Sequence, residues 1–193
     1  MFELLFQKLN EKVSLTPEEE EICKAFFVPK KLRKRQYLLQ EGDVCKYTAF
    51  VEKGALRIYT IDDKGLEHVL QFGIEGWWVG DLYSFLTGEP STYNIEAIED
   101  CELLLLSRPA QEELLEKVPK FERYQRLLTQ GAYIALQRRM MTTISLPAEE
   151  KYTRLVNTYP DIVQRVPQHM IASYLGITPE TLSRIRKNLA TKK

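Results

Sequence analysis

The residues that most clearly suggest a specific chemistry lie in the last part of the sequence. Glu180 and Arg184 are four positions apart, so they share one face if this segment is helical. A carboxylate on such a face can accept a hydrogen bond from cytosine N4, and a guanidinium can donate a pair of hydrogen bonds to guanine O6 and N7. Thr181 and Ser183 can make weaker contacts with bases or phosphates. The chemistry predicted for this helix is base recognition in a DNA major groove.

The residues around that face have the types that a helix-turn-helix unit requires. Ala172 is small enough for two helices to approach each other, and Gly176 tolerates a left-handed turn. Thr178 can cap the second helix, and Pro179 then occupies its first position. The apolar positions that would set the angle between the helices are Ile171, Leu175, Ile177, Leu182 and Ile185. An ordinary helical hairpin would rarely combine these features, so the segment predicts a DNA-binding head with its second helix in the major groove.

The predicted DNA contacts extend over both helices of this unit. The side chains concerned are Gln168, His169, Thr178, Pro179, Glu180, Thr181, Ser183, Arg184 and Lys187, while Arg186, Lys192 and Lys193 would add attraction for phosphates. The net charge is zero, but residues 146–193 carry 8 basic and 4 acidic residues, whereas residues 40–120 carry 7 and 16. This asymmetry favours a polyanionic partner for the C-terminal part, although a solvated basic surface would also explain it.

The middle of the chain has the pattern of short β-strands. Apolar or alternating runs occur at residues 37–39, 48–51, 55–61, 68–72, 93–98 and 101–106. Turn residues separate them, for example in the segments 41–43 and 62–65. Several short strands at a spacing of roughly ten residues indicate a β-sandwich, a jelly roll or a barrel.

Helical patterns occur on both sides of these strands. Residues 1–25 contain an amphipathic helix and a second helix that Thr16 caps. A long helix is expected over residues 119–142, and shorter ones over 148–157, 168–175 and 179–189. The long helix has two apolar stripes, which are Phe121–Leu128–Ala135 and Leu127–Ile134–Met141. One stripe can pack on the chain's own β domain and the other on a partner helix, and a single wide core face is the alternative.

Length and composition exclude several other classes of protein. The chain has 193 residues, of which 44% are hydrophobic and 28% charged, as in one or two globular domains. Apolar runs are too short for a membrane span and the N-terminus does not have the pattern of a signal peptide, so we expect a cytoplasmic protein. Cys23, Cys45 and Cys101 are too few for a four-cysteine iron–sulfur cluster and are expected to be reduced and mostly buried. His68 and His169 fall in different predicted domains, so we expect no metal. The sequence has no recognisable nucleophile–base pair or phosphate-cradling glycine loop, so we expect no cofactor and no enzymatic activity.

The sequence resembles the Crp–Fnr transcription factors, the family of the cyclic-AMP receptor protein and the fumarate–nitrate regulator. The segment 178–184 looks like the recognition helix of that family, and the resemblance covers nearly the whole chain. It implies an α+β fold with an N-terminal double-stranded β-helix, a jelly roll like that of cyclic-nucleotide-binding domains, over residues 1–118. A long dimerisation helix over 119–145 and an all-α helix-turn-helix domain over 146–193 would follow. The implied partners are double-stranded DNA, a second copy of the chain, RNA polymerase and a small-molecule effector, with no membrane.

The C-terminal part departs from the family pattern at two points. Pro179 stands where the cyclic-AMP branch has a further base-contacting arginine, so the preferred DNA sequence should differ. The family usually adds a β-hairpin wing after the recognition helix, and no such pattern follows the predicted last helix, so we expect a wingless head. The alternative function is a ligand-binding or protein-interaction module that no longer binds DNA. The polar face of the second helix argues against that alternative.

Residues 79–93 are similar, without gaps, to the family's phosphate-binding cassette. Asp81 stands where a glutamate would hold the ribose, and Ser91 stands where an arginine would pair with the cyclic phosphate, while Thr92 keeps a hydroxyl. Residues 65–107 contain eight acidic residues and no lysine or arginine. A buried phosphate without a cationic partner loses several kcal/mol through desolvation. We therefore expect that cyclic AMP does not bind.

The expected effector is an uncharged or weakly acidic small molecule, unless the protein works without one. The residues predicted to line its site are Trp77, Trp78, Gly80, Asp81, Leu82, Phe85, Ser91 and Thr92. For the two tryptophans, packing is the first interpretation and ligand contact is the alternative.

Overall fold

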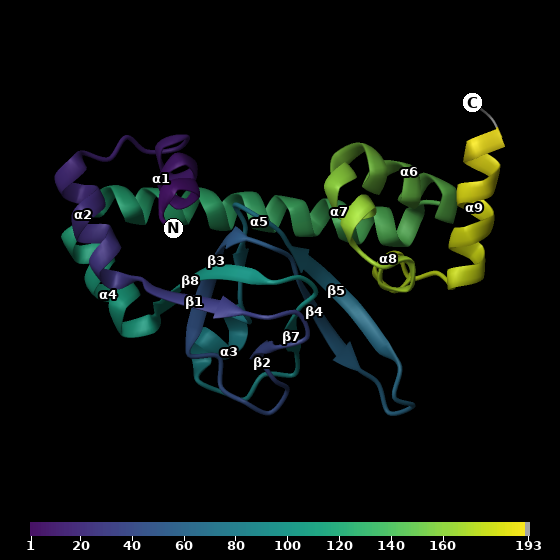
Figure 1. The fold of residues 1–193 in the computed structure, drawn as a ribbon, viewed down its shortest axis with the longest axis horizontal. Helices are drawn as coiled ribbons and strands as arrows, with labels where there is room; N and C mark the ends of the chain where they lie inside the picture. The colour runs from purple at the N-terminus through teal and green to yellow at the C-terminus, as the bar shows by residue number, and fades with distance from the viewer. Residues whose placement is uncertain (192–193) are drawn as a thin grey trace.

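The computed structural model describes residues 1–191. Its helices are α1 (Glu3–Asn10), α2 (Pro17–Phe26), α3 (Leu82–Thr87), α4 (Arg108–Lys117), α5 (Pro119–Ser145), α6 (Ala148–Thr158), α7 (Pro160–Arg165), α8 (Gln168–Leu175) and α9 (Pro179–Thr191). Its strands are β1 (Val28–Leu32), β2 (Tyr37–Leu39), β3 (Tyr47–Lys53), β4 (Leu56–Ile61), β5 (Glu67–Gly73), β6 (Trp78–Val79), β7 (Asn94–Ala97) and β8 (Cys101–Ser107). In Figure 1 the strands form a β-roll beneath α5, and α6 to α9 form a head at one end of that helix. Among the described residues no helix is both long and apolar enough to cross a membrane.

The β-roll consists of two antiparallel sheets that pack face to face. Sheet A has the strand order β1-β8-β3-β6, and sheet B has the order β2-β7-β4-β5. Leu56, Ile95 and Leu103 lie fully buried in the cluster between them. The predicted α+β fold, with a jelly roll, a long helix and a helical head, is confirmed. The sequence pattern does not predict β1, which is largely exposed, or β6, which is two residues long.

Helices α1, α2, α4 and the first half of α5 cover sheet A. Phe50 and Leu104 of the sheet share a buried cluster with Phe121 and Tyr124 of α5. The predicted cap of α2 is confirmed, because the Thr16 hydroxyl accepts a hydrogen bond from the backbone N–H of residue 19 at 3.2 Å. These contacts attach one end of α5 firmly to the β-roll.

Burial of α5 changes along its length. Phe121 is buried and Leu128 packs partly against the same cluster, but Ala135 is exposed. The first apolar stripe therefore packs on the chain's own β domain only over its first two positions. In the second half of the helix the exposed large apolar side chains are Tyr133, Ile134, Leu136, Met140, Met141 and Ile144. Most of the second stripe is thus uncovered in the single chain, so the whole helix does not form one wide core face.

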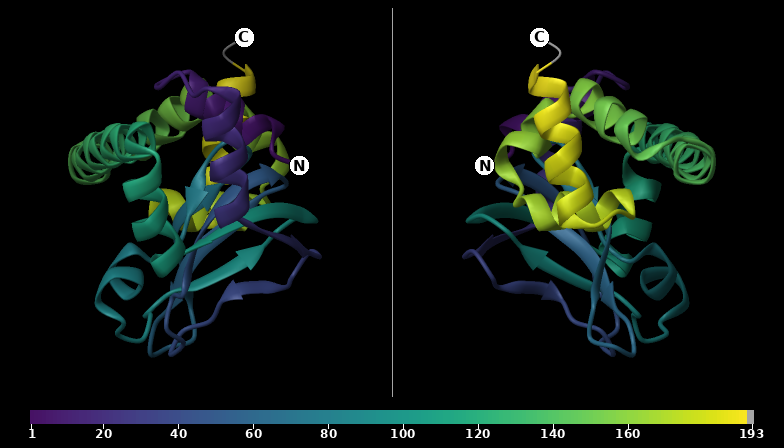
Figure 2. Two further views of the ribbon diagram at one scale, coloured as in Figure 1. Left: turned by 90° about the vertical axis from the view of Figure 1, so that its left-hand side faces the viewer. Right: turned by 90° about the vertical axis from the view of Figure 1, so that its right-hand side faces the viewer.

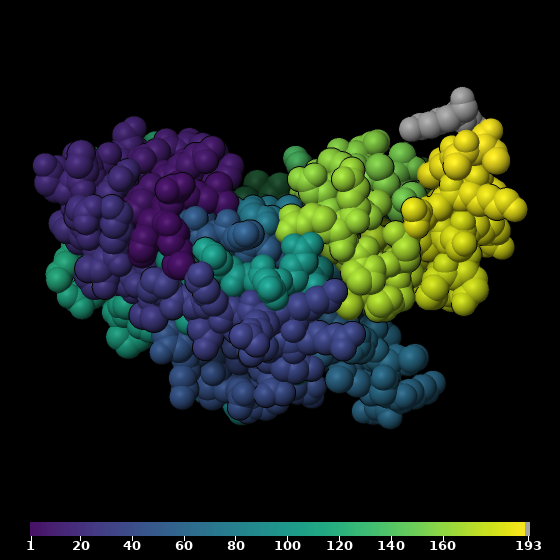
Figure 3. All heavy atoms as spheres, viewed as in Figure 1, coloured from purple at the N-terminus to yellow at the C-terminus, as the bar shows by residue number. Residues whose placement is uncertain are grey.

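The head packs directly on the outer face of sheet B. Figure 3 shows it in contact with the β-roll at the end opposite the N-terminal helices. Phe72 of β5 lies with its ring centroid 5.3 Å from that of Tyr174 in α8, and Trp77 lies 5.2 Å from Tyr159. One apolar cluster joins β4 and β5 to α6, α8 and α9. The head and the β-roll therefore share one apolar cluster.

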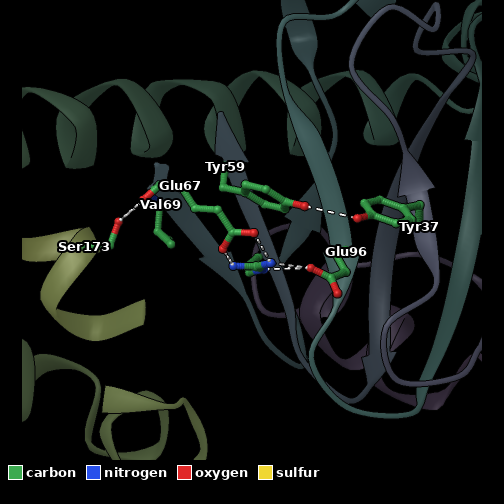
Figure 4. A network of polar contacts seen from close by, with 7 residues as sticks. Tyr37, Tyr59, Glu67, Val69, Glu96 and Ser173 are labelled. Atoms are coloured by element: carbon green, nitrogen blue, oxygen red, sulfur yellow. Dashed lines mark hydrogen bonds and ion pairs between the residues drawn. The ribbon is translucent and has the colours of Figure 1, made fainter. Parts of the chain in front are cut away.

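Polar contacts reinforce this docking (Figure 4). The Ser173 hydroxyl of α8 donates to the carbonyl of Glu67 at 2.9 Å and accepts from the N–H of Val69 at 2.9 Å, so it pairs with the free edge of β5. Arg165 of α7 binds the carboxylate of Glu75 at 2.7 Å and that of Glu99 at 2.5 Å. The position of the head relative to the β-roll is thus fixed by hydrogen bonds as well as by apolar packing.

Candidate DNA interface and effector cassette

The turn between α8 and α9 has the geometry that its sequence predicts. Gly176 adopts a left-handed conformation with φ of +67°, and the N–H of Ile177 donates to the carbonyl of Ala172 at 3.0 Å. Ala172 is fully buried at the point where the helices approach. The Thr178 hydroxyl accepts a hydrogen bond from the backbone N–H of Thr181 at 3.2 Å and so caps α9. The local prediction of a helix-turn-helix is therefore confirmed.

The outer face of α9 is polar and open, while Leu182 and Ile185 hold its inner face in the core. The side chains that line a shallow hollow on this outer face are Pro179, Glu180, Ser183, Arg184 and Lys187. Hydrogen bonding by its own backbone N–H and by the Thr178 hydroxyl lowers the pKa of Glu180. The carboxylate is therefore ionised near neutral pH and can accept a donor such as an exocyclic amine.

The other predicted DNA contacts lie at the edges of this face. Thr181 is half-buried, and its hydroxyl lies 3.2 Å from that of Thr178. At the start of α8, His169 is exposed, whereas Gln168 is half-buried and its Oε1 has no hydrogen-bond partner within residues 1–191. Arg186 is exposed. Lys192 and Lys193, which are predicted to attract phosphates, lie outside the described residues.

In the cassette, the two residues that depart from the family pattern bind each other. Asp81 is 4% and Ser91 2% exposed, and the Ser91 hydroxyl donates to the Asp81 carboxylate at 2.7 Å. The other Asp81 oxygen accepts from the N–H of Ser84 at 3.2 Å and caps α3. The N–H of Tyr93 donates to the Ser91 hydroxyl at 3.0 Å. Both side chains thus have partners within the chain, and neither is left free to hold a ligand group.

The predicted apolar wall of an effector site does not form. Phe85 is buried between the two sheets, Trp77 packs toward the head, and Trp78 packs against the cluster around Phe50 on the other side. The indole N–H of Trp78 donates to the hydroxyl of Tyr124 at 3.0 Å. Trp77 and Trp78 thus lie in different apolar clusters, and both are packing residues, the first of the two alternatives given for them.

The remaining pocket residues are also dispersed. Leu82 is 53% exposed on the outer side of α3, Thr92 is exposed, and Gly80 is half-buried beside Thr48. Of the eight residues predicted for the effector site, the structure brings Asp81 and Ser91 into direct contact.

Arginines from outside residues 65–107 reach into this acidic region. Arg57 is 6% exposed and binds Glu67 and Glu96, and its guanidinium lies 4.0 Å from the ring centroid of Tyr59. Figure 4 shows this network on sheet B, with Tyr37 bound to Tyr59. The span is therefore less acidic in space than in sequence, although Arg57 is already paired with two carboxylates.

Sequence reasoning misses the residues that dock the head. Arg165 and Glu75 are 90 positions apart, and Ser173 and Glu67 are 106 apart. No spacing rule connects residues at such separations. Arg139 of α5, which donates to the carbonyl of Leu70 on β5, has no sequence signal either.

The cysteines are buried, and the two histidines are exposed. Cys23, Cys45 and Cys101 are buried free thiols, and burial raises the pKa of Cys23 to about 12 and that of Cys101 to about 11. His68 is exposed and lies 2.9 Å from Asp62. Within residues 1–191 no group of three or more histidine, cysteine, aspartate or glutamate side chains is placed to hold a metal ion.

The chain is similar to known transcription regulators over most of its length. Residues 29–118 match the cyclic nucleotide-binding domain family. The chain is 25% identical over 167 residues to the fumarate and nitrate reduction regulatory protein of Vibrio cholerae, covering 81% of this chain and 66% of that protein. It is 27% identical over 165 residues to the transcriptional activator protein anr of Pseudomonas aeruginosa, covering 80% of this chain and 67% of that protein. The chain thus resembles the Crp–Fnr regulators over about four fifths of its length.

Solved structures of Crp–Fnr regulators have the same fold. FixK2 from Bradyrhizobium japonicum superposes with a TM-score of 0.71 at 22% identity, over 86% of this chain and 85% of that chain. The c-di-GMP responsive global regulator CLP of Xanthomonas campestris superposes with a TM-score of 0.73 at 18% identity, over 92% and 93%. The curated Crp–Fnr relatives regulate transcription, and the chain spans about two thirds of their length.

Proposed function

We propose that this protein is a DNA-binding transcription regulator of the Crp–Fnr type that acts as a homodimer on an inverted-repeat operator. The observation that carries the proposal is the open polar face of α9, held outward by a capped start and a buried underside. Arg184 would donate to guanine and Glu180 would accept from cytosine, while Lys187 would bind phosphate. The names of the curated relatives, which are regulators of transcription, support the same function.

The dimer would form through the second half of α5. Six large apolar side chains are exposed there, and a monomer rarely leaves so many together on one helix. In this arrangement residues 1–118 would act as the sensor, 119–145 as the dimerisation helix and 146–193 as the DNA-binding domain. A two-fold axis along the paired helices would place two copies of α9 about 34 Å apart, one helical turn of DNA.

The β-roll would not be switched by cyclic AMP in the usual way. The hydrogen bond between Asp81 and Ser91 supports this, since both side chains are buried and satisfied by the protein itself. A phosphate at that place would have to break this bond and would meet no arginine in exchange. The effector, if the protein uses one, would be an uncharged or weakly acidic small molecule. RNA polymerase would be the partner through which bound protein changes transcription in the cytoplasm.

Selection of bound duplexes from a random-sequence pool tests the proposal. The expected product is an inverted repeat whose half-sites lie about 34 Å apart, centre to centre. Selection with Arg184→Ala should relax one base position in each half-site, at a cost of about 1–3 kcal/mol on the original sequence. A pool that gains no sequence preference over repeated rounds would refute DNA recognition by α9.

A further inference from the structure

The face of α5 that is proposed to form the dimer does not stay apolar along its whole length. Residues seven positions apart lie nearly above one another on a helix, so the exposed rows of its second half can be followed back into its first half. Two of the rows begin there with Arg123 and Arg126 instead of apolar side chains. The three rows, which we call the seam face, are Arg123–Gln130–Gln137–Ile144, Leu127–Ile134–Met141 and Arg126–Tyr133–Met140.

Neither arginine of the seam face is neutralised in the single chain. Both side chains are exposed, and within residues 1–191 neither forms an ion pair, whereas Lys120 of the same helix pairs with Glu19 at 2.7 Å. Figure 2 shows in both views that α5 lies at the outer edge of the molecule. A second copy of the chain can therefore reach these two charges, and nothing in the described chain compensates them.

A glycine lies beside these arginines in the middle of α5. Glycine stabilises a helix less than alanine does, and a Cβ atom at Gly131 would meet no atom within 4 Å. Packing within the single chain therefore does not require a glycine there. If the row that starts at Arg123 occupies the d positions of a heptad, Arg126 is a g position and Gly131 is the next e position, which faces it across a parallel two-stranded seam. The position opposite each Arg126 then has neither a carboxylate nor a side chain.

We propose that the dimer binds a multivalent phosphate anion, of which inorganic pyrophosphate is the simplest example, on its two-fold axis between Arg123 and Arg126 of the two copies, and that this anion strengthens the dimer. The inference rests on the proposed homodimer, because each copy supplies half of the four guanidinium groups. Without an anion the four like charges repel one another across the seam face. A bound anion neutralises them and so favours association.

The chemistry of the four side chains selects the class of ligand. A planar guanidinium donates pairs of hydrogen bonds to phosphate oxygens, and side chains three positions apart on a helix are neighbours, so Arg123 and Arg126 can hold one phosphate group together. Several positive charges around one axis favour an anion with several negative charges over chloride. The site is separate from the β-roll cassette, where the buried Asp81 carboxylate and the Ser91 hydroxyl provide no cation.

The test measures how an anion changes association of the full chain. Sedimentation equilibrium gives the dimer dissociation constant with and without inorganic pyrophosphate, at equal ionic strength set with sodium chloride. Arg126→Gln removes one guanidinium of the site from each copy. Arg33→Gln is the matched control, because it removes another exposed charge from the turn after β1, which Figure 2 shows on the opposite side of the molecule from α5. Calorimetric titration with pyrophosphate counts the anions bound.

The unmodified chain and Arg33→Gln should bind one pyrophosphate per dimer. At about 100 times its dissociation constant, the anion should lower the dimer dissociation constant about 100-fold, because it binds the dimer and not the monomer. Arg126→Gln should associate about two- to fivefold more tightly than the unmodified chain without the anion, since a repulsion between exposed charges is removed. The same variant should bind pyrophosphate at least about tenfold more weakly, since hydrogen bonds to a charged group are lost.

The possible failures are distinguishable. A dimer whose dissociation constant pyrophosphate does not change, or changes equally in Arg126→Gln, would overturn the axis site while leaving the proposed function intact. Weaker association of Arg126→Gln without the anion would show that Arg126 pairs with a carboxylate across the seam face, such as that of Glu122, and would also overturn the inference. If the unmodified chain is monomeric both with and without pyrophosphate, the proposed homodimer itself fails.

Discussion

Replacement of Ile144 by glutamate should prevent dimerisation without harming the fold of the single chain. Ile144 lies near the C-terminal end of α5 and is 77% exposed, so the monomer gains little from its burial. In a two-fold dimer through α5 the same side chain would pack against its partner helix, where a carboxylate is costly. The substitution therefore separates the stability of the dimer from that of the monomer.

The magnitude follows from the area left exposed. Full burial of an isoleucine side chain contributes about 1.5–3 kcal/mol, and roughly three quarters of that is available here, or about 1–2 kcal/mol for each copy. Both copies change in a two-fold dimer, so about 2–4 kcal/mol of association free energy should be lost. This corresponds to a rise of roughly 30- to 700-fold in the dimer dissociation constant, before any cost of bringing two carboxylates together.

Sedimentation equilibrium at tens of micromolar measures the effect directly, and thermal unfolding checks the fold. Thr143→Glu is the matched control, because it adds the same charge at the adjacent exposed position, about 100° around the helix. We expect Ile144→Glu to be monomeric and the control dimeric. If Ile144→Glu and the unmodified chain have the same mass, or if the unmodified chain is monomeric, the assignment of α5 as the dimer seam is refuted. Ala135 is less suitable as a test, since it shares a helix side with Arg139, which contacts β5.

Four other predictions concern the head and the cassette. Arg165→Gln should destabilise docking of the head by about 1–2 kcal/mol, because two partly exposed ion pairs with hydrogen bonds are lost, and urea unfolding measures the change. Burial raises the pKa of Glu75, but hydrogen bonds from Arg165 and from backbone N–H groups outweigh burial, so the pKa is lowered overall. The stability that Glu75 contributes should therefore be fully present above the ordinary glutamate pKa and be lost as the pH falls through the lowered pKa. An identical pH dependence of stability in Arg165→Gln would contradict this prediction. Calorimetric titration with cyclic AMP should give no dissociation constant below about 10 μM, equivalent to about −7 kcal/mol, and tighter binding would refute the account of the cassette. Lys187→Ala should weaken binding to specific and unrelated DNA alike and lower the salt slope by about 1, and an effect on the selected sequence alone would show that Lys187 reads bases.

The parts of the fold that the sequence predicts are those that local rules govern. Alternation of apolar residues finds most strands, and Thr16, Thr178 and Gly176 predict two helix starts and one turn because capping and a positive φ restrict the residue type. The α9 face is predictable for the same reason, since it depends on spacing within one helix.

The remaining features depend on which distant segments meet. The docking of the head through Arg165 and Ser173 joins residues about a hundred positions apart, which no local pattern records. The contact between Asp81 and Ser91 follows only once the cassette has folded back on itself. Trp77 directly precedes β6, which the sequence pattern does not predict, so the separation of Trp77 from Trp78 is not predicted either.

The most direct test of the central claim, that α9 reads DNA sequence, is the ratio of two affinities. Fluorescence anisotropy at about 0.15 M salt can measure binding of the full chain to the selected inverted repeat and to a duplex of the same composition in scrambled order. Specific regulators typically bind their sites at least about a thousandfold more tightly than unrelated DNA, and we predict such a ratio here, reduced by about 1–3 kcal/mol in Arg184→Ala. Equal affinity for the two duplexes, or a ratio that Arg184→Ala leaves unchanged, would contradict the account.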